Sequence, residues 1–163
     1  MPTWSVLYIQ SRYEFKVEQQ LQKLGIRHFL PKIQVRKNWS DRVKKMLVPA
    51  FPSYLFVCIE PKDRNAVFQV KGVLHYVRHD QKDAQLKEED INLLRASESQ
   101  LIPSSFQPLQ KLKGQLIKIR SGILAGRSGL LVDFLGKKTV QLKLEQISLG
   151  FLIEMPLEDL QIA

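Results

Sequence analysis

The sequence contains little cysteine, little histidine and no long apolar run. Cys58 is the single cysteine among 163 residues, which excludes an internal disulfide framework and fits a reducing compartment. No run approaches the roughly 20 apolar residues that a membrane helix requires. The N-terminus, MPTWSVLYIQ, lacks the charged start and small-residue cleavage site of a secretory signal. We therefore expect a soluble cytoplasmic protein without a membrane partner.

Patterns typical of catalysis are also scarce. The three histidines, His28, His75 and His79, lack the spacing to cysteine or carboxylate that a zinc site shows, and no Gly-rich phosphate loop is present. Cys58 lies in an apolar stretch, which favours a small buried side chain over a reactive thiol. The sequence thus predicts binding rather than catalysis, with no metal and no cofactor. The alternative is an enzyme built around Cys58, and it predicts that an alkylating reagent modifies this thiol rapidly in the native protein.

Acidic residues are outnumbered by basic ones. The chain has 25 Lys and Arg against 16 Asp and Glu, a formal net charge of +9 and a pI near 9.7. Residues 1–97 carry +7 of this charge and residues 98–163 carry +2. A polyanionic partner is therefore expected, and we expect the first part of the chain to bind it.

Hydrophobic periodicity divides the first part into alternating elements. The order of expected elements is β, α, β, β, β, α, β, α, which predicts one compact α+β domain over residues 1–97 with a mainly antiparallel sheet. The strands are expected at 4–10, at 54–60, at 72–80 and in two arms around a polar tip at 38–41; the helices are expected at 14–24, 61–70 and 87–97.

The second part changes character. Residues 98–111, rich in Ser, Gln and Pro, resemble a linker. Over residues 112–163, short apolar runs alternate with glycines such as Gly114, Gly122, Gly126 and Gly129, which mark tight turns and bulges. This pattern predicts a small C-terminal β-barrel. Each glycine costs about 1 kcal/mol in a helix interior, so strands are favoured over a helical hairpin.

The stretch VPAFPSYLFV, residues 48–57, raises a question about burial. From Tyr54 onward, side chains alternate between the two faces of the expected strand. Tyr54, Phe56 and Cys58 point one way, whereas Leu55 and Val57 point the other, and neither face is polar. Either helices cover both faces within the domain, or one face binds a partner.

Two basic features accompany this strand. Arg12, Lys16, Gln20 and Lys23 form a stripe along the expected first helix, away from its apolar face; we call them the basic stripe. Residues 32–45 carry six Lys or Arg and one Asp, with Trp39 at the tip. Both features fit a phosphate backbone. The alternatives are a solvated helix face and a hairpin that charge protects from aggregation.

In combination, these motifs resemble the NusG family of transcription elongation factors. WSVLYIQ is similar to the family's first strand, PAFPSYLFV to its Pro-x-Phe-Pro-x-Tyr-Leu-Phe-Val motif, and GVLHYVRHD to a later strand. GQLIKIRSGILAGRSGLLVDF looks like the KOW motif of its C-terminal barrel. The resemblance implies an N-terminal NGN domain at 1–97, a linker at 98–111 and a KOW domain at 112–163. Compact length and the WSDRVKK arm resemble the specialised paralogues, represented by RfaH and the antiterminators of capsular-polysaccharide operons.

The resemblance also implies partners. The family's aromatic pocket receives the clamp helices of the largest RNA polymerase subunit, which suppresses pausing or termination. By position, the pocket comprises Tyr8, Phe51, Pro52, Ser53, Tyr54 and Phe56. The implied contacts to non-template DNA are the basic stripe and Arg78; the arm residues Trp39, Lys44 and Lys45 are further candidates for nucleic-acid binding.

The C-terminal domain is expected to recruit a second partner. In the family this partner is Rho or a small-subunit ribosomal protein, and the candidate contacts here are Ile123, Leu124 and Phe134. The chain's own C-terminal domain is an alternative occupant of the pocket. A ribosome-associated or RNA-binding KOW protein is the alternative function, but it would place the main basic surface on the barrel. We expect a monomer.

Overall fold

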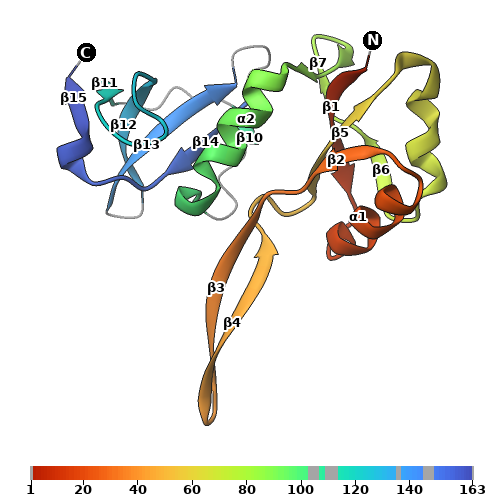
Figure 1. Ribbon diagram of the computed structural model, residues 1–163, viewed down its shortest axis with the longest axis horizontal. Helices are drawn as coiled ribbons and strands as arrows, with labels where there is room; N and C mark the ends of the chain where they lie inside the picture. The colour runs from red at the N-terminus through yellow and green to blue at the C-terminus, as the bar shows by residue number, and fades with distance from the viewer. Residues whose placement is uncertain (1, 103–106, 109–113, 135–136, 145–148, 163) are drawn as a thin grey trace.

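The computed structural model describes residues 2–102, 107–108, 114–134, 137–144 and 149–162, apart from a few side chains. Figure 1 shows an N-terminal sheet with its helices, a two-stranded arm that projects from it, and a C-terminal sheet beside helix α2. The expected α+β class with antiparallel sheets is confirmed.

The N-terminal sheet is built on β1. Strands β2 (Arg27–Phe29), β5 (Tyr54–Ile59), β1 (Thr3–Ile9) and β6 (Val73–Tyr76) lie in the order β2-β5-β1-β6, and β9 (Gln85–Leu86) also pairs with β1. The pairs are antiparallel, and the register sets Tyr8 opposite Tyr54. Aromatic and β-branched residues fill these strands, as the pleated surface favours.

Helix α1 (Glu14–Lys23) and the 3-10 helix η1 (Pro61–Gln69) cover one face of this sheet. Val17 and Leu21 of α1 are fully buried in a cluster with residues of the sheet and η1. The α1 segment ends before Gly25, whose φ of +70° is a left-handed conformation that glycine adopts without steric cost. This face buries the strand residues Leu7, Ile9, Leu55 and Val57.

Helix α2 (Glu88–Ser97) covers the other face, together with the short 3-10 helix η2 (Glu98–Gln100). Ile91 and Leu94 are fully buried in a cluster with Trp4 and Phe56. The Trp4 indole N–H donates to the Glu88 carboxylate at 2.6 Å. Both faces of β5 are therefore covered inside the molecule.

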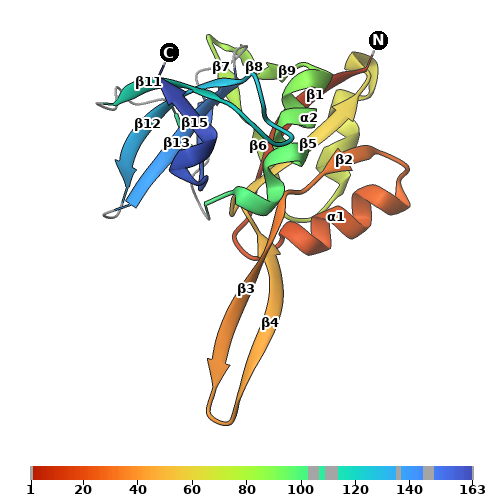
Figure 2. The ribbon, with the colours of Figure 1, turned by 60° about the vertical axis from the view of Figure 1, so that its left-hand side comes forward.

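The arm consists of β3 (Lys32–Trp39) and β4 (Arg42–Pro49), joined by the two residues Ser40 and Asp41. Figures 1 and 2 show that it projects from the sheet, away from the rest of the molecule. Its base is fixed at Lys32: the backbone N–H donates to Glu98 at 2.9 Å, and the ammonium group pairs with Glu18 at 2.9 Å.

The strand expected at 72–80 is divided into two. β6 ends at Tyr76, and β7 (Arg78–His79) pairs instead with β8 (Lys82–Asp83). Asp80 and Gln81, with φ of +51° and +65°, form the turn between β7 and β8. Left-handed conformations at two consecutive positions match the tight turns that join hairpin strands.

The C-terminal sheet contains six antiparallel strands in the described residues. Their order is β10-β14-β13-β12-β11-β15. Ile117, Leu142 and Phe151 form the centre of its apolar cluster. The bounds are β10 (Gln107–Pro108), β11 (Gln115–Ile119), β12 (Ser128–Phe134), β13 (Lys137–Leu144), β14 (Leu149–Ile153) and β15 (Leu160–Ile162), and the 3-10 helix η3 (Leu157–Asp159) precedes β15. The expected strand character of this segment is confirmed.

Candidate functional site

A tight turn before β5 brings together the motif residues of the predicted pocket. Ser53 has a φ of +71°. Its backbone N–H donates to the Glu14 carboxylate at 3.2 Å, and its carbonyl accepts the Ile9 N–H at 2.7 Å. Glu14 is 5% exposed, so the turn is held by a buried carboxylate of α1 as well as by β1.

Three rings continue from this turn across the sheet. Tyr54 and Tyr8 pack edge to face, with centroids 5.6 Å apart, and His75 of β6 stacks on Tyr8 at 5.1 Å with a 15° interplanar angle. Burial raises the pKa of the Tyr54 hydroxyl, and the neighbouring Tyr8 raises it further. We call Tyr54, Tyr8 and His75 the aromatic row. Tyr54 and Tyr8 are half-buried and His75 is exposed.

The predicted pocket residues do not form one open surface. Pro52 is exposed and Ser53 is half-buried, but Phe51 is 1% exposed and Phe56 is fully buried. Phe56 belongs to the cluster beneath α2. The structure therefore brings Tyr8, Tyr54 and the turn together and places the two phenylalanines inside.

Phe51 is buried partly by the C-terminal sheet. Its ring lies 6.1 Å from that of Phe151 on β14, centroid to centroid. The segment after η2 joins the same sheet, because Leu101 pairs with Ile153 and the Ile102 N–H donates to the Leu152 carbonyl at 3.0 Å. One apolar cluster thus runs from the N-terminal domain into the C-terminal sheet.

The basic stripe lies on and just before α1. Lys16, Gln20 and Lys23 are exposed along the helix, and Arg12 is exposed in the turn that precedes it. Lys16 and Gln20 line a surface depression of about 380 Å³, which also contains residues that the sequence reasoning did not select: Tyr13, Gln19, Gln69 and Lys71. Gln69 and Lys71 come from the end of η1 and the segment after it, about 50 residues along the chain. Only the folded chain brings them next to α1.

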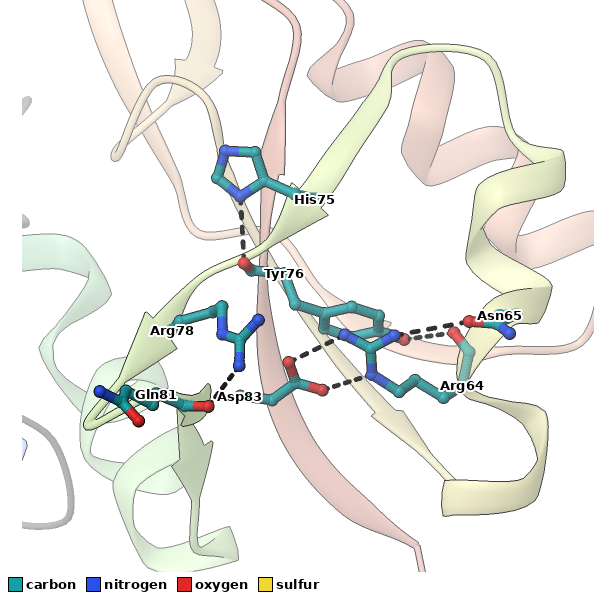
Figure 3. Close-up of polar contacts among 7 residues, drawn as sticks. All are labelled: Arg64, Asn65, His75, Tyr76, Arg78, Gln81 and Asp83. Atoms are coloured by element: carbon teal, nitrogen blue, oxygen red, sulfur yellow. Dashed lines mark hydrogen bonds and ion pairs between the residues drawn. The ribbon is translucent and has the colours of Figure 1, made fainter.

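Arg78 lies on the β7–β8 hairpin, which an ion pair anchors to η1. Two nitrogens of the Arg64 guanidinium donate to the Asp83 carboxylate, at 2.5 and 2.9 Å. The Tyr76 hydroxyl donates to the Arg64 backbone carbonyl at 2.7 Å, and Figure 3 shows these groups together. The guanidinium of Arg64 holds the pKa of the Asp83 carboxyl below its usual range. Arg78 is exposed but donates to the Gln81 carbonyl of its own turn.

The tip of the arm exposes an aromatic ring among cations. Trp39 is 55% exposed, and the ammonium group of Lys44 lies 5.9 Å from the ring centroid. Lys44 and Lys45 are both exposed. These three residues belong to the arm, with Trp39 in the last strand pair before the turn, and Figure 2 shows the arm projecting away from α1.

The predicted C-terminal contacts separate in the same way as the pocket residues. Ile123 is 85% exposed in the β11–β12 turn, whereas Leu124 is only 3% exposed and packs into the sheet's core. The side chain of Phe134 lies outside the described residues. Ile123 is therefore the one of the three that the structure shows at the surface.

Other kinds of site are not found in the described part of the chain. It contains no group of three or more His, Cys, Asp or Glu side chains placed to hold a metal ion. Burial raises the pKa of the Cys58 thiol, which disfavours the nucleophilic thiolate. Every helix among these residues is too short or too polar to cross a lipid bilayer.

Comparison with known proteins places this geometry in a family. The family described as transcription termination factor nusG matches residues 2–95, more than half of the chain. A structure titled "Domain interaction in Thermotoga maritima NusG" aligns over 99% of this chain and 97% of its own, with a TM-score of 0.58 and 18% identity. An MjSpt4:Spt5 complex aligns over 98% and 97%, with a TM-score of 0.32 and 13% identity, too low to support an argument. No curated protein matches the sequence. The chain belongs to the NusG family of transcription factors, and its N-terminal domain has the NGN fold.

Proposed function

We propose that this chain is a non-enzymatic elongation and antitermination factor that binds the clamp helices of RNA polymerase through the aromatic row and the Phe51–Ser53 turn. Family membership supports a role in transcription elongation and contact with the polymerase. The observation that carries the proposal is the aromatic row beside a turn fixed by Glu14. Preorganised aromatic anchors are typical of binding hot spots.

The C-terminal sheet regulates access to this surface in our proposal. Phe151 covers Phe51, so the polymerase reaches the whole surface only after the sheet moves away. The half-buried rings of Tyr8 and Tyr54 supply the first contact. The neighbouring structure whose title names a domain interaction in NusG supports contact between the two parts.

The nucleic-acid contact in this proposal is the exposed non-template strand. Lys16 and Lys71 supply cations and Gln20 and Gln69 supply amides in a single depression, a combination that fits a phosphate together with a base edge. Arg12, Lys23 and Arg78 would extend this contact, and the arm residues Trp39, Lys44 and Lys45 would form a separate nucleic-acid contact. The contacts to phosphate would position the protein on the strand without recognising its base sequence.

We assign the chain to the specialised paralogues, the branch of RfaH and the capsular-operon antiterminators. We also propose that its C-terminal sheet is a KOW domain that recruits a second partner. Ile123, exposed at a turn, would contact a ribosomal protein or Rho. The basic arm supports this branch.

The test is binding of the full chain to a clamp-helices fragment of the polymerase, with Tyr54→Ala as the variant. Loss of a hot-spot ring costs roughly 2 kcal/mol, or about thirtyfold in Kd. Tyr54→Phe is the matched control, because it keeps the ring, and circular dichroism checks that both variants fold. Equal binding by Tyr54→Ala and the wild type would contradict the proposal.

A further inference from the structure

The arm carries its cations on both faces. Cross-strand partners share a face of a two-stranded ribbon, and the register pairs Trp39 with Arg42, Lys37 with Lys44, and Arg36 with Lys45. Arg42 and Lys44 therefore lie on one face, whereas Arg36 and Lys45 lie on the other. All four side chains are exposed.

This charge arrangement is unfavourable for the hairpin alone. Arg36 stands directly opposite Lys45, and like charges at facing positions destabilise a strand pair. Within the described residues, none of the four cations pairs with a carboxylate. If charge served only solubility, an oppositely charged pair at these facing positions would serve as well and would stabilise the hairpin. The like-charged pair therefore indicates that the arm binds a polyanion.

The shape of the arm narrows the choice of polyanion. Its strands of eight residues extend about 27 Å at roughly 3.4 Å per residue, and Figures 1 and 2 show both faces standing clear of the body. Residues on opposite faces point in opposite directions, so one single-stranded backbone meets only one pair of cations. A groove with a phosphate wall on each side meets both pairs.

We propose that the arm enters the major groove of double-stranded DNA, with Arg42 and Lys44 toward one phosphate wall and Arg36 and Lys45 toward the other. The B-form major groove, about 12 Å wide, admits a two-stranded β-ribbon. The deep, narrow major groove of A-form RNA does not. The inference rests on the proposed nucleic-acid role of the arm and adds the double helix as its partner.

The base of the arm makes such a contact productive. Lys32 is held by Glu98 through its backbone and by Glu18 through its side chain, and the Ala50 N–H donates to the Pro31 carbonyl at 2.8 Å. These bonds fix both strands where they leave the domain. Little ordering of the base is therefore needed on binding, which reduces the entropic cost.

The test measures binding of the full chain to a 25-base-pair DNA duplex, to one of its strands and to an RNA duplex of the same sequence, by fluorescence anisotropy across salt concentrations. We expect the DNA duplex to bind at least tenfold more tightly than either alternative. Two variants separate the faces: Arg36→Thr with Lys45→Thr, and Arg42→Thr with Lys44→Thr. Threonine is used because it keeps strand propensity. Each variant should lower the slope of log K against log salt by about 1.8, since each phosphate contact contributes about 0.9.

The control removes two exposed strand lysines elsewhere, Lys82→Thr with Lys118→Thr, and should change duplex affinity less than twofold. An effect confined to one face, equal binding of the single strand or the RNA duplex, or an equal effect of the control would each overturn the inference. Binding of the same variants to the clamp-helices fragment is measured in parallel. If the wild type does not bind this fragment, the proposed polymerase contact is contradicted. The duplex measurement still decides the role of the arm in that case.

Discussion

Arg64 and Asp83 join two segments that the chain separates. The Arg64 guanidinium, on η1, donates two hydrogen bonds to the Asp83 carboxylate. Its Cζ also lies 4.5 Å from the centroid of the Tyr76 ring. The pair fixes the β7–β8 hairpin, and with it Arg78, against the N-terminal domain. Because the Arg64 side chain is 43% exposed, solvent screens the pair, and its net contribution to stability is about 1 kcal/mol or less.

This pair gives the fold a defined pH dependence. Hydrogen bonding by Arg64 lowers the folded-state pKa of Asp83, whereas the pKa of an aspartate in the unfolded chain is about 4. The stabilisation is therefore complete above about pH 4 and is lost as pH falls through the lower, folded-state pKa. Urea unfolding of the wild type and Asp83→Asn from pH 7 to 2.5 should show a gap in stability that closes at the acidic end. A gap of constant size would show that the charge of Asp83 contributes nothing.

At the scale of elements, one of the contacts that hold the base of the arm can be removed by a single substitution. The Lys32 N–H donates to the Glu98 carboxylate, so the first residue of β3 is tied to η2. Glu98→Ala removes the acceptor and leaves a half-buried donor, at a cost of about 1–2 kcal/mol. We expect faster amide hydrogen exchange at Lys32, while exchange in α1 stays unchanged. Glu98→Gln is the control, since its amide oxygen still accepts; equal exchange in the wild type and Glu98→Ala would exclude this anchor.

Elements with a strong local pattern were predictable from the sequence. The helical spacing of Val17 and Leu21 predicted α1. The polar tip at 38–41 predicted the turn of the arm, where the strands end at Trp39 and begin at Arg42. The segment expected as one strand at 72–80 forms two strands, β6 and β7. The second of them pairs with β8 across the turn at Asp80 and Gln81, a pairing that no local pattern predicts.

In the candidate site, too, the residues set by a local pattern were predictable and those brought in from distant segments were not. Alternation along β5 separates Tyr54 and Phe56 from Leu55 correctly, because a strand's period is local. His75, Gln69 and Lys71 were missed because they reach the aromatic row and the basic stripe from distant segments. The burial of Phe51 against Phe151 joins residues 100 positions apart, so the sequence contains no local trace of it.

At the scale of the whole molecule, the domain contact and the proposed polymerase contact compete for Phe51. The C-terminal sheet holds it through Phe151, and the segment after η2 extends the edge of that sheet at Leu101 and in β10. The arm and helix α1, which carries most of the basic stripe, lie away from this contact in Figures 1 and 2. In the proposed function, nucleic acid would therefore bind while the domains are together, whereas full polymerase binding would require their separation.

A reversible covalent lock tests this competition. Leu101 and Ile153 face each other without bonding directly, since their neighbours carry the bonds: Ile102 to Leu152, and Glu154 to Gln100 at 2.9 Å. Such pairs have Cα atoms about 4.5 Å apart, within the range a disulfide spans. In a Cys58→Ser background, Leu101→Cys with Ile153→Cys should lock Phe151, two residues from position 153, over Phe51.

We expect oxidation of this variant to weaken binding to the clamp-helices fragment at least tenfold and dithiothreitol to restore it. Duplex DNA affinity should stay constant in both states, because the arm is not part of the domain contact. The single variant Ile153→Cys, treated in the same way, controls for loss of the buried isoleucine. Equal affinity of the oxidised and reduced forms would mean that Tyr8 and Tyr54 suffice for the polymerase, and that the C-terminal sheet does not regulate access to them.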